Sequence, residues 1–286
     1  MRMTQRLRKQ VTGDGIAIAP GVYDGLSARL ARMAGFDLLY VTGGGVARSA
    51  GVPDLGLLDT SEVVRRLEQI VDVVDIPVIA DADTGYGNAL NARRAARAFE
   101  RAGVAALHLE DQTFPKRCGH YDDKALVSTA EFQQKLRAVR DALHDPDFVL
   151  IARTDAIAVE GFDAAIDRAE AYVEAGADVV FVEAPRTVEE IEEVARRVPH
   201  PKLINMFHGG KTPLVPVSRL AELGYRLVIV PGDMQRAAIR AMQRVLETIR
   251  ADGDSGAIVD EMAPFQERER VVDTATWLEL DRRFSA

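Results

Sequence analysis

The sequence is poor in cysteine and contains no long apolar run. Its 286 residues include one cysteine, Cys118, which excludes an internal disulfide framework and a zinc site built from cysteines. No stretch reaches the roughly 20 apolar residues needed to cross a bilayer, and no apolar segment of a secretion signal follows the basic residues 1–10. We therefore expect a cytoplasmic protein that has no membrane partner.

An excess of basic residues is also missing. The 36 Lys and Arg residues are outnumbered by 44 Asp and Glu residues, which gives a formal net charge of -8. This charge has the wrong sign for a protein that follows a phosphate backbone, so we expect no nucleic-acid partner. A hydrophobic content of 47% with 28% charged residues is typical of a soluble globular protein and excludes a disordered or collagen-like chain.

No Pro- or Ser-rich linker divides the chain before about Asp252. Short runs rich in Val, Ile, Leu and Ala recur, and each precedes about ten to fifteen residues with helical spacing. We predict eight strands, at Ile16–Ala19, Leu38–Val41, Pro77–Ala80, Ala105–Leu109, Val149–Arg153, Val179–Glu183, Leu203–Asn205 and Leu227–Val230. This pattern predicts a (β/α)8 TIM-type barrel over residues 1–250, with a helical tail over residues 251–286 that packs on the barrel or on a partner subunit.

The segments between the predicted strands have the apolar spacing of amphipathic helices. We predict helices at Leu26–Ala34, Ser61–Val73, Ala92–Ala102, Phe132–Leu143 and Ala164–Ala175. Several of the predicted connections carry a glycine suited to a left-handed helix cap, namely Gly35, Gly103, Gly176 and Gly224.

Polar residues cluster just after the predicted strands, where a barrel of this type carries its chemistry. Asp81 and Asp83 follow the third strand, and Glu110 follows the fourth. Converging carboxylates repel one another unless a hard cation neutralises them, and an all-oxygen set suits Mg²⁺ or Mn²⁺. For any one of these residues, capping a helix is an equally good interpretation. For the set we predict a metal site, in which some carboxylates act through water.

The single cysteine lies in a polar loop after the fourth strand. In Lys116-Arg117-Cys118-Gly119-His120 the thiol is flanked by cations and a histidine, which favours the thiolate, and Gly119 lets the backbone bend. Most lone cysteines are inert packing residues, but this setting favours a reactive one. His108, in contrast, falls inside a strand, and we expect it to be a core residue.

Two arginines and a glycine run complete the candidate set. Thr42-Gly43-Gly44-Gly45 follows the second strand and brings backbone N–H groups within reach of an anion, although three glycines alone more often mark a flexible turn. Arg153 and Arg236 stand at the ends of strands five and eight, where a guanidinium can hold a substrate carboxylate with two bonds. Pairing of Arg153 with Glu183 or Asp155 is the structural alternative.

Taken together, these residues resemble the isocitrate lyase and phosphoenolpyruvate mutase superfamily, in the branch of 2-methylisocitrate lyases, alkylmalate lyases and carboxyphosphonoenolpyruvate mutases. The resemblance extends from Pro20 to about Phe284. Its motifs are Thr42-Gly43-Gly44-Gly45, Gly51-Val52-Pro53-Asp54-Leu55-Gly56, Asp81-Ala82-Asp83-Thr84-Gly85-Tyr86-Gly87, Glu110-Asp111-Gln112, Lys116-Arg117-Cys118-Gly119-His120, Ala152-Arg153-Thr154-Asp155-Ala156 and Gly209-Gly210-Lys211-Thr212-Pro213.

The resemblance implies an assembly and a set of roles. It implies a barrel whose last helix is exchanged between subunits, a homotetramer of such dimers, and Mg²⁺ held near Asp81, Asp83 and Glu110. It implies that Cys118 is the general acid, within a gate formed by its loop and by residues 47–56, and that Arg153 and Glu183 are catalytic. Substrate contacts are implied for Thr42, Gly43, Gly44, Asp54, Gly119, His120, Asn205 and Arg236.

We therefore expect a Mg²⁺-dependent carbon-carbon lyase that cleaves a 2-hydroxy di- or tricarboxylate, of the 2-methylisocitrate or 2,3-dimethylmalate type, to pyruvate or a related 2-oxo acid and a second carboxylic acid. The base that removes the hydroxyl proton stays open among Tyr40, Tyr86, Glu183 and a metal-bound hydroxide. The alternatives are a carboxyphosphonoenolpyruvate-type phosphonomutase, an oxaloacetate hydrolase, to which Pro231 is a mild objection, and a non-catalytic binding barrel. A Schiff-base aldolase is disfavoured because Lys202 lies at the wrong end of its strand.

Two aromatic residues bear on the choice of acid. Phe207 and Phe265 stand where 2-methylisocitrate lyases present Thr and a carboxylate-binding Arg. An apolar surface there favours an alkyl group over a carboxylate. From this comparison we expect alkyl-substituted malates to be better substrates than isocitrate, with 2-methylisocitrate possible if Arg236 supplies the missing contact.

Overall fold

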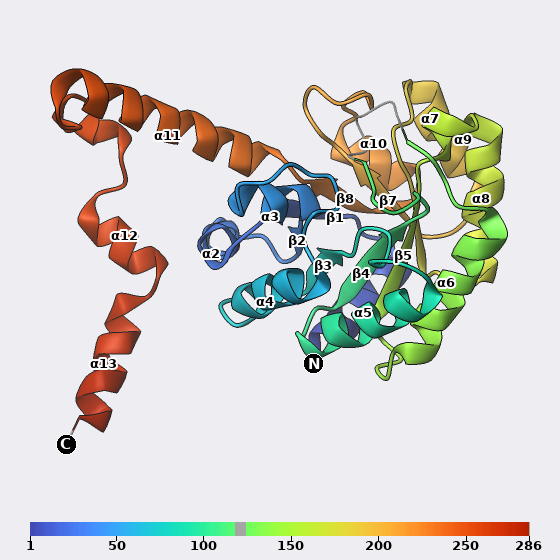
Figure 1. The fold of residues 1–286 in the computed structure, drawn as a ribbon, viewed down its shortest axis with the longest axis horizontal. Coiled ribbons are helices and arrows are strands. Elements are labelled where there is room, and N and C mark those ends of the chain that lie inside the picture. Colours follow the sequence, from blue (N-terminus) through green and yellow to red (C-terminus); the bar gives the residue numbers. More distant parts are fainter. Residues whose placement is uncertain (118–123, 286) are drawn as a thin grey trace.

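The chain forms a closed barrel of eight parallel strands surrounded by helices (Figure 1). The structure is a computed structural model, and it describes residues 1–117 and 124–285. The strands are β1 (Ala17–Val22), β2 (Leu39–Val41), β3 (Val78–Asp81), β4 (Ala106–Glu110), β5 (Val149–Thr154), β6 (Val179–Val182), β7 (Lys202–Asn205) and β8 (Tyr225–Val230). Each strand pairs with its neighbours in sequence, and β1 closes the barrel on β8. The predicted (β/α)8 barrel is confirmed.

Helices connect the strands and cover the outside of the barrel. They are α1 (Met3–Thr12), α2 (Gly25–Met33), α3 (Gly43–Ser49), α4 (Thr60–Val71), α5 (Ala89–Arg101), α6 (Thr129–Ala142), α7 (Ala156–Val159), α8 (Phe162–Glu174), α9 (Val188–Arg197), α10 (Val217–Glu222), α11 (Asp233–Asp252), the 3-10 helix η1 (Gly256–Glu261), α12 (Phe265–Val271) and α13 (Thr274–Phe284). All five predicted amphipathic segments are helical. The four predicted glycine caps have positive φ angles, from 79° at Gly224 to 103° at Gly176, as a left-handed cap requires.

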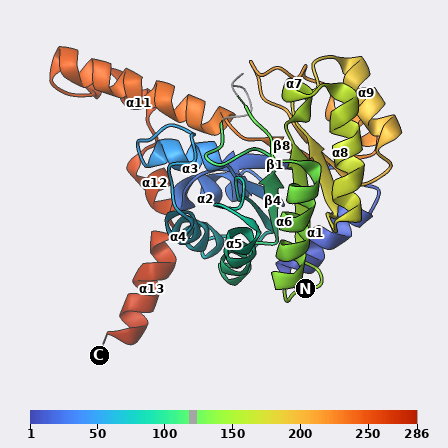
Figure 2. The same cartoon turned by 45° about the vertical axis from the view of Figure 1, so that its right-hand side comes forward.

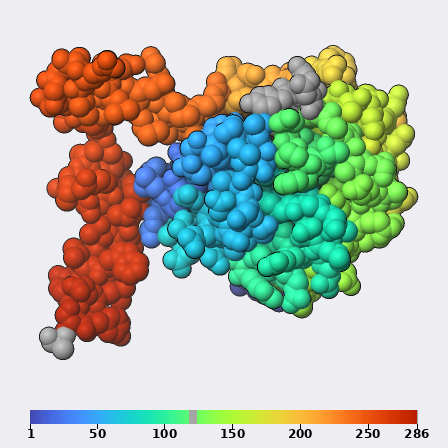
Figure 3. Space-filling model, viewed as in Figure 1, coloured from blue at the N-terminus to red at the C-terminus, as the bar shows by residue number. Residues whose placement is uncertain are grey.

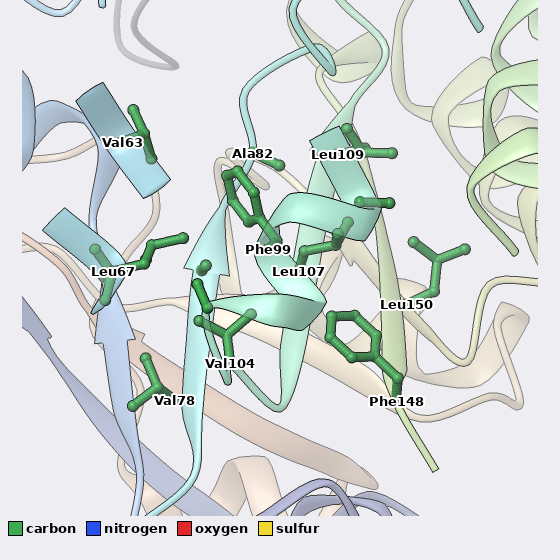
Figure 4. Packing of buried hydrophobic residues seen from close by; sticks show 14 of the residues in the cluster. Val63, Leu67, Val78, Ala82, Phe99, Val104, Leu107, Leu109, Phe148 and Leu150 are labelled. Carbon is green, nitrogen blue, oxygen red and sulfur yellow. The ribbon is translucent and has the colours of Figure 1, made fainter. Parts of the chain in front are cut away.

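The main core lies between the strands and the covering helices. Strands buried on both faces are rich in branched apolar residues, and their outward side chains pack against the apolar stripes of the helices. Figure 4 shows this packing where Phe99 of α5 lies over Leu107 and Leu109 of β4. The barrel interior forms a separate apolar cluster, which Leu7 and Val11 of α1 close at the amino ends of the strands.

The segment after β8 leaves the barrel. We call residues 233–285 the C-terminal arm. Its first helix, α11, projects away from the strands, and α12 and α13 descend beside the body of the molecule (Figures 1 and 2). In the space-filling view of Figure 3 the arm stands largely apart from the barrel. Only Gln235 and Thr248 of α11 are buried, while Ile239, Met242, Leu246 and Ile249 are exposed. None of the helices within the described ranges is both long and apolar enough to span a membrane.

Candidate active site

The carboxyl ends of the strands surround a cavity of about 240 Å³. Most of the predicted site residues meet there because the ends of parallel strands converge at one rim of the barrel. The cavity is lined by Tyr40, Thr42, Gly44, Arg48, Asp54, Asp81, Lys116, Arg153, Glu183, Asn205, Phe207, Ile229, Pro231, Gly232, Gln235, Arg236 and Ile239. Asp83, Glu110 and Gly43 lie directly behind this wall, in contact with lining residues. The predicted Cys118, Gly119 and His120 lie outside the described residues.

The backbone of the glycine run after β2 lies next to Asp81 at the cavity. Thr42 caps α3, and its Oγ1 accepts a hydrogen bond from the Gly45 N–H at 3.4 Å. The Gly43 N–H donates to Asp81 Oδ2 at 3.2 Å. A Cβ atom at Gly43 would come within 2.8 Å of that oxygen, so a residue with a side chain would disturb the contact. The run is therefore part of the site rather than a flexible turn.

Asp81 is a carboxylate of the cavity wall with several close polar partners. It accepts from the Tyr40 hydroxyl at 3.3 Å and lies 3.2 Å from His108 Nε2. Burial by itself would raise the pKa of Asp81, but His108, Lys116 and Arg153 together lower it well below its ordinary value. Asp81 is therefore an ionised carboxylate at the cavity wall. His108 is buried as predicted, yet it also contacts the site, since its Nε2 lies 2.6 Å from the Tyr40 hydroxyl.

A buried lysine joins the second aspartate to the loop after α3. The Lys116 ammonium lies 2.9 Å from Asp83 Oδ1 and 2.5 Å from Asp54 Oδ1, and Lys116 is only 4% exposed. Burial lowers the pKa of Lys116, but the surrounding carboxylates, Asp83 first, raise it well above its ordinary value. Burial raises the pKa of Asp83. The sequence analysis placed Lys116 only in the cysteine motif and missed this role.

Arg153 occupies the centre of the rim between two carboxylates. Its Nε and Nη2 donate to the two oxygens of Asp155 at 3.0 and 3.1 Å, and its Nη1 lies 3.4 Å from Glu110 Oε2. Asp155 is shared with Lys124 at 2.8 Å. The alternative in which Arg153 pairs with Asp155 is thus confirmed, and Arg153 also lines the cavity. Burial raises the pKa of Glu110 well above its ordinary value, and Arg153 opposes the rise.

These ion pairs correct one part of the sequence-based argument for a metal. We argued that Asp81, Asp83 and Glu110 would face one another uncompensated, and this is wrong because Lys116 pairs with Asp83 and Arg153 pairs with Glu110. Among the described residues, no three metal-binding side chains converge on one point. A cage of direct carboxylate ligands is therefore absent from the part of the chain that is described.

The residues still fit a magnesium ion that keeps several of its waters. Glu110 Oε1 is buried and has no hydrogen-bond partner, and Asp81 presents an ionised carboxylate at the cavity wall. Mg²⁺ binds proteins through one or two carboxylates and reaches others through water. A water bound to the metal would supply the hydrogen-bond partner that this buried carboxylate oxygen lacks in the protein.

Other residues that line the cavity contribute buried polar atoms and one aromatic ring. Glu183 Oε2 and Asn205 Oδ1 are buried without a hydrogen-bond partner, and both residues line the cavity, so a ligand with donor groups can satisfy them. Phe207 lines the cavity as expected, and the Arg236 guanidinium lies 5.2 Å from its ring centroid. Phe265 is 68% exposed in the arm and does not line the cavity of its own chain.

Several residues that line the cavity were not predicted from the sequence. Arg48, Gln235 and Ile239 line the cavity from α3 and α11, and the signal that could have located Arg48 was its helical spacing from Gly44. Lys202 lies at the amino end of β7, as expected, where its ammonium donates to the carbonyls of Val198 and His200. Burial lowers the pKa of Lys202 to about 8, but the residue is remote from the rim.

A parallel barrel with carboxylates, cations and an open cavity at its carboxyl rim defines a (β/α)8-barrel protein built for a small anionic ligand. The family described as phosphoenolpyruvate phosphomutase matches residues 7–250. The chain therefore belongs to this family, within the phosphoenolpyruvate mutase and isocitrate lyase superfamily.

Relatives of known activity cover most of the chain. A 2-methylisocitrate lyase of Aeropyrum pernix is 45% identical over 90% of this chain and 82% of its own length. A 2,3-dimethylmalate lyase of Eubacterium barkeri is 40% identical over 93% of both chains. Both of these relatives are carbon-carbon lyases.

Solved structures show the same fold with a range of activities. A crystal structure of 2,3-dimethylmalate lyase matches with a TM-score of 0.93 and 38% identity, over 99% of this chain and 95% of the other. An oxaloacetate acetylhydrolase bound to 3,3-difluorooxalacetate matches with a TM-score of 0.92 and 35% identity, over 98% and 96%. A phosphonopyruvate hydrolase in complex with oxalate and Mg²⁺ matches with a TM-score of 0.91 and 32% identity, over 99% of both chains.

Proposed function

We propose that this protein is a cytoplasmic, Mg²⁺-dependent carbon-carbon lyase that cleaves a 2-hydroxy di- or tricarboxylate to pyruvate or a related 2-oxo acid and a second carboxylic acid. The observation that carries the proposal is the rim cavity, which is lined by an ionised Asp81, by Arg153 and by the buried polar atoms of Glu183 and Asn205 that lack partners. The 2-methylisocitrate lyase and 2,3-dimethylmalate lyase relatives support the choice of reaction.

Asp81, Asp83 and Glu110 are the residues that would hold the metal. When bound, Mg²⁺, or Mn²⁺ in its place, supplies a Lewis acid that polarises the hydroxyl and carboxylate oxygens of the substrate. Lys116 holds Asp83 in place, and Arg153 holds Glu110. The Gly43 N–H fixes the position of Asp81 Oδ2.

The remaining groups bind the substrate and move its protons. Arg153, Asn205, Arg236, Thr42, Gly44 and Asp54 line the cavity and surround the acid. The bond between C2 and C3 breaks, its electron pair stays on the departing acid, and the hydroxyl proton is lost as the C2 carbonyl forms. Cys118, within the Gly119-His120 loop, protonates the departing carbon. This step is balanced, because one proton leaves the hydroxyl oxygen and one is delivered to carbon.

Glu183 is the described side chain best suited to accept the hydroxyl proton. Burial raises the pKa of both Tyr40 and Tyr86 well above the ordinary value, with nearby aspartates adding to the rise, so both phenols stay protonated. Glu183 lines the cavity and presents a buried oxygen that has no partner. A general base must lie within hydrogen-bond reach of the proton that it removes, and Glu183 lines the same cavity as Arg153 and Asn205, which supports this assignment.

We also propose that subunits exchange α11 and assemble as a homotetramer of swapped dimers, in which residues 251–286 form a tail that packs on a neighbour. The exposed apolar side chains of α11 and α13 support this assembly, because an uncovered apolar stripe of this length is typical of an interface.

The test is a substrate screen with the magnesium-loaded protein. We expect 2-oxo acid release from 2-methylisocitrate or 2,3-dimethylmalate, and loss of turnover in EDTA that Mg²⁺ or Mn²⁺ restores. Isocitrate, oxaloacetate and carboxyphosphonoenolpyruvate are assayed in parallel, because relatives include an oxaloacetate acetylhydrolase and the family is named for a phosphomutase. Turnover of carboxyphosphonoenolpyruvate or oxaloacetate alone would refute the lyase assignment, and full activity in EDTA would refute the metal.

A further inference from the structure

Four cationic side chains line the cavity, and three of them pair with carboxylates. Lys116 pairs with Asp54 and Asp83, Arg153 pairs with Asp155 and Glu110, and Arg236 pairs with Asp233. The fourth cation, Arg48, lines the same cavity, and its guanidinium forms no ion pair or hydrogen bond with any described residue.

The position of Arg48 follows from helix geometry. Side chains on a helix lean toward its amino end, so residue 48 of α3 covers residue 44 one turn earlier. Because residue 44 is glycine, the guanidinium lies directly over the backbone. A Cβ atom on Gly44 would come within 2.9 Å of Arg48 Nη1 and within 2.9 Å of Asp54 Oδ2. The absence of a side chain at Gly44 therefore lets Arg48 reach into the cavity.

We propose that Arg48 is a specificity-determining residue that binds a distal carboxylate of the substrate, so that a tricarboxylate is preferred over an alkylmalate. This inference rests on the proposed lyase function. A guanidinium without an ionic partner can offer two parallel hydrogen bonds to a carboxylate. Arg48 is exposed at the entrance of the cavity, so its guanidinium stays hydrated until a ligand binds.

The proposal reverses the preference predicted from Phe207 and Phe265. That prediction assumed that no guanidinium replaces the Arg of the 2-methylisocitrate lyases. Phe265 does not line the cavity of its own chain, whereas Arg48 does. Phe207 still supplies an apolar patch, but the Arg236 guanidinium lies over its ring and is a further cation lining the same cavity.

The experiment compares 2-methylisocitrate with 2,3-dimethylmalate in the wild type, Arg48→Ala and Arg48→Lys. The control is Arg94→Ala, which removes an exposed guanidinium on α5 away from the cavity. For Arg48→Ala we expect kcat/KM to fall about tenfold or more with 2-methylisocitrate, mainly through KM, and less than about threefold with 2,3-dimethylmalate. Arg48→Lys should recover part of the loss. Equal losses on both acids, no loss, or a wild-type preference for 2,3-dimethylmalate would overturn the proposal.

A binding measurement separates this proposal from the lyase assignment. Titration calorimetry with propane-1,2,3-tricarboxylate and methylsuccinate on the magnesium-loaded protein needs no turnover. We expect Arg48→Ala to weaken the tricarboxylate about tenfold and the dicarboxylate less than about threefold. If neither acid is cleaved but this difference holds, the lyase assignment fails and the role of Arg48 stands. If the wild type binds the two ligands equally, or binds neither, the role of Arg48 fails.

Discussion

The barrel and the C-terminal arm differ in how they bury apolar surface. In the barrel the large side chains of Phe99, Phe132 and Tyr172 are fully buried, and the charges at the rim pair within the same chain. In the arm, Leu246 is 65% exposed and Trp277 is equally so. The comparison indicates that the barrel contains its own core, whereas the arm leaves large apolar side chains exposed, which is what the proposed exchange between subunits would cover. Substitutions in the two regions should therefore have different effects.

The largest effect should come from the buried guanidinium of the barrel. Arg153→Ala leaves Glu110 without its cation and Asp155 with Lys124 alone, and removing one member of a buried ion pair costs about 3–5 kcal/mol. We expect the free energy of unfolding to fall by about that amount and turnover to disappear, as measured by urea denaturation and by 2-oxo acid release. Arg153→Lys is the control, and it should retain part of the stability because the charge remains. A fully stable Arg153→Ala protein would show that the rim charges do not support the fold.

Substitution of Cys118 should lower the rate of the reaction without changing the free energy of unfolding. Serine is a far weaker acid than cysteine, and a general acid contributes roughly 10²- to 10⁴-fold to the rate. We expect Cys118→Ser to lower kcat by this range while the unfolding curve stays unchanged. Thiol reagents should inactivate the wild type, and bound substrate should protect it. A near-normal rate for Cys118→Ser would assign the thiol to packing.

The smallest effect on folding should come from the arm. Leu246→Asp places a charge on the exposed apolar side of α11. We expect association between subunits to weaken by about 2 kcal/mol or more, roughly 30-fold, while unfolding of the barrel is nearly unchanged. Analytical ultracentrifugation measures the first quantity and urea denaturation the second. The control, Glu247→Ala, alters the polar side of the same helix and should leave the assembly intact. An unchanged mass for Leu246→Asp would refute the exchanged-helix interface.

The positions of the strands could be predicted from the sequence, but the ion-pair partners of the charged residues could not. Eight apolar runs located the strands because buried parallel strands must be apolar on both faces, and the rim residues followed from the ends of those runs. The partners of the charged groups depend on three-dimensional distances. Lys116 meets Asp83 from a separate loop, and Lys124 meets Asp155 across 31 residues. Spacing along the chain does not encode such contacts. The position of Arg48 over Gly44, in contrast, follows from helical spacing and could have been predicted.

The closure of the barrel by α1 has a consequence for handling the protein. Of the six lysines in the sequence, Lys116, Lys124, Lys135 and Lys202 are buried, Lys211 is half-buried, and Lys9 on α1 is exposed. Amine-directed coupling should therefore favour Lys9 and the amino group of Met1. Because α1 covers the amino ends of the strands, a molecule immobilised in this way would present its cavity to the solution. Ligand binding could then be followed on a sensor surface without an added tag.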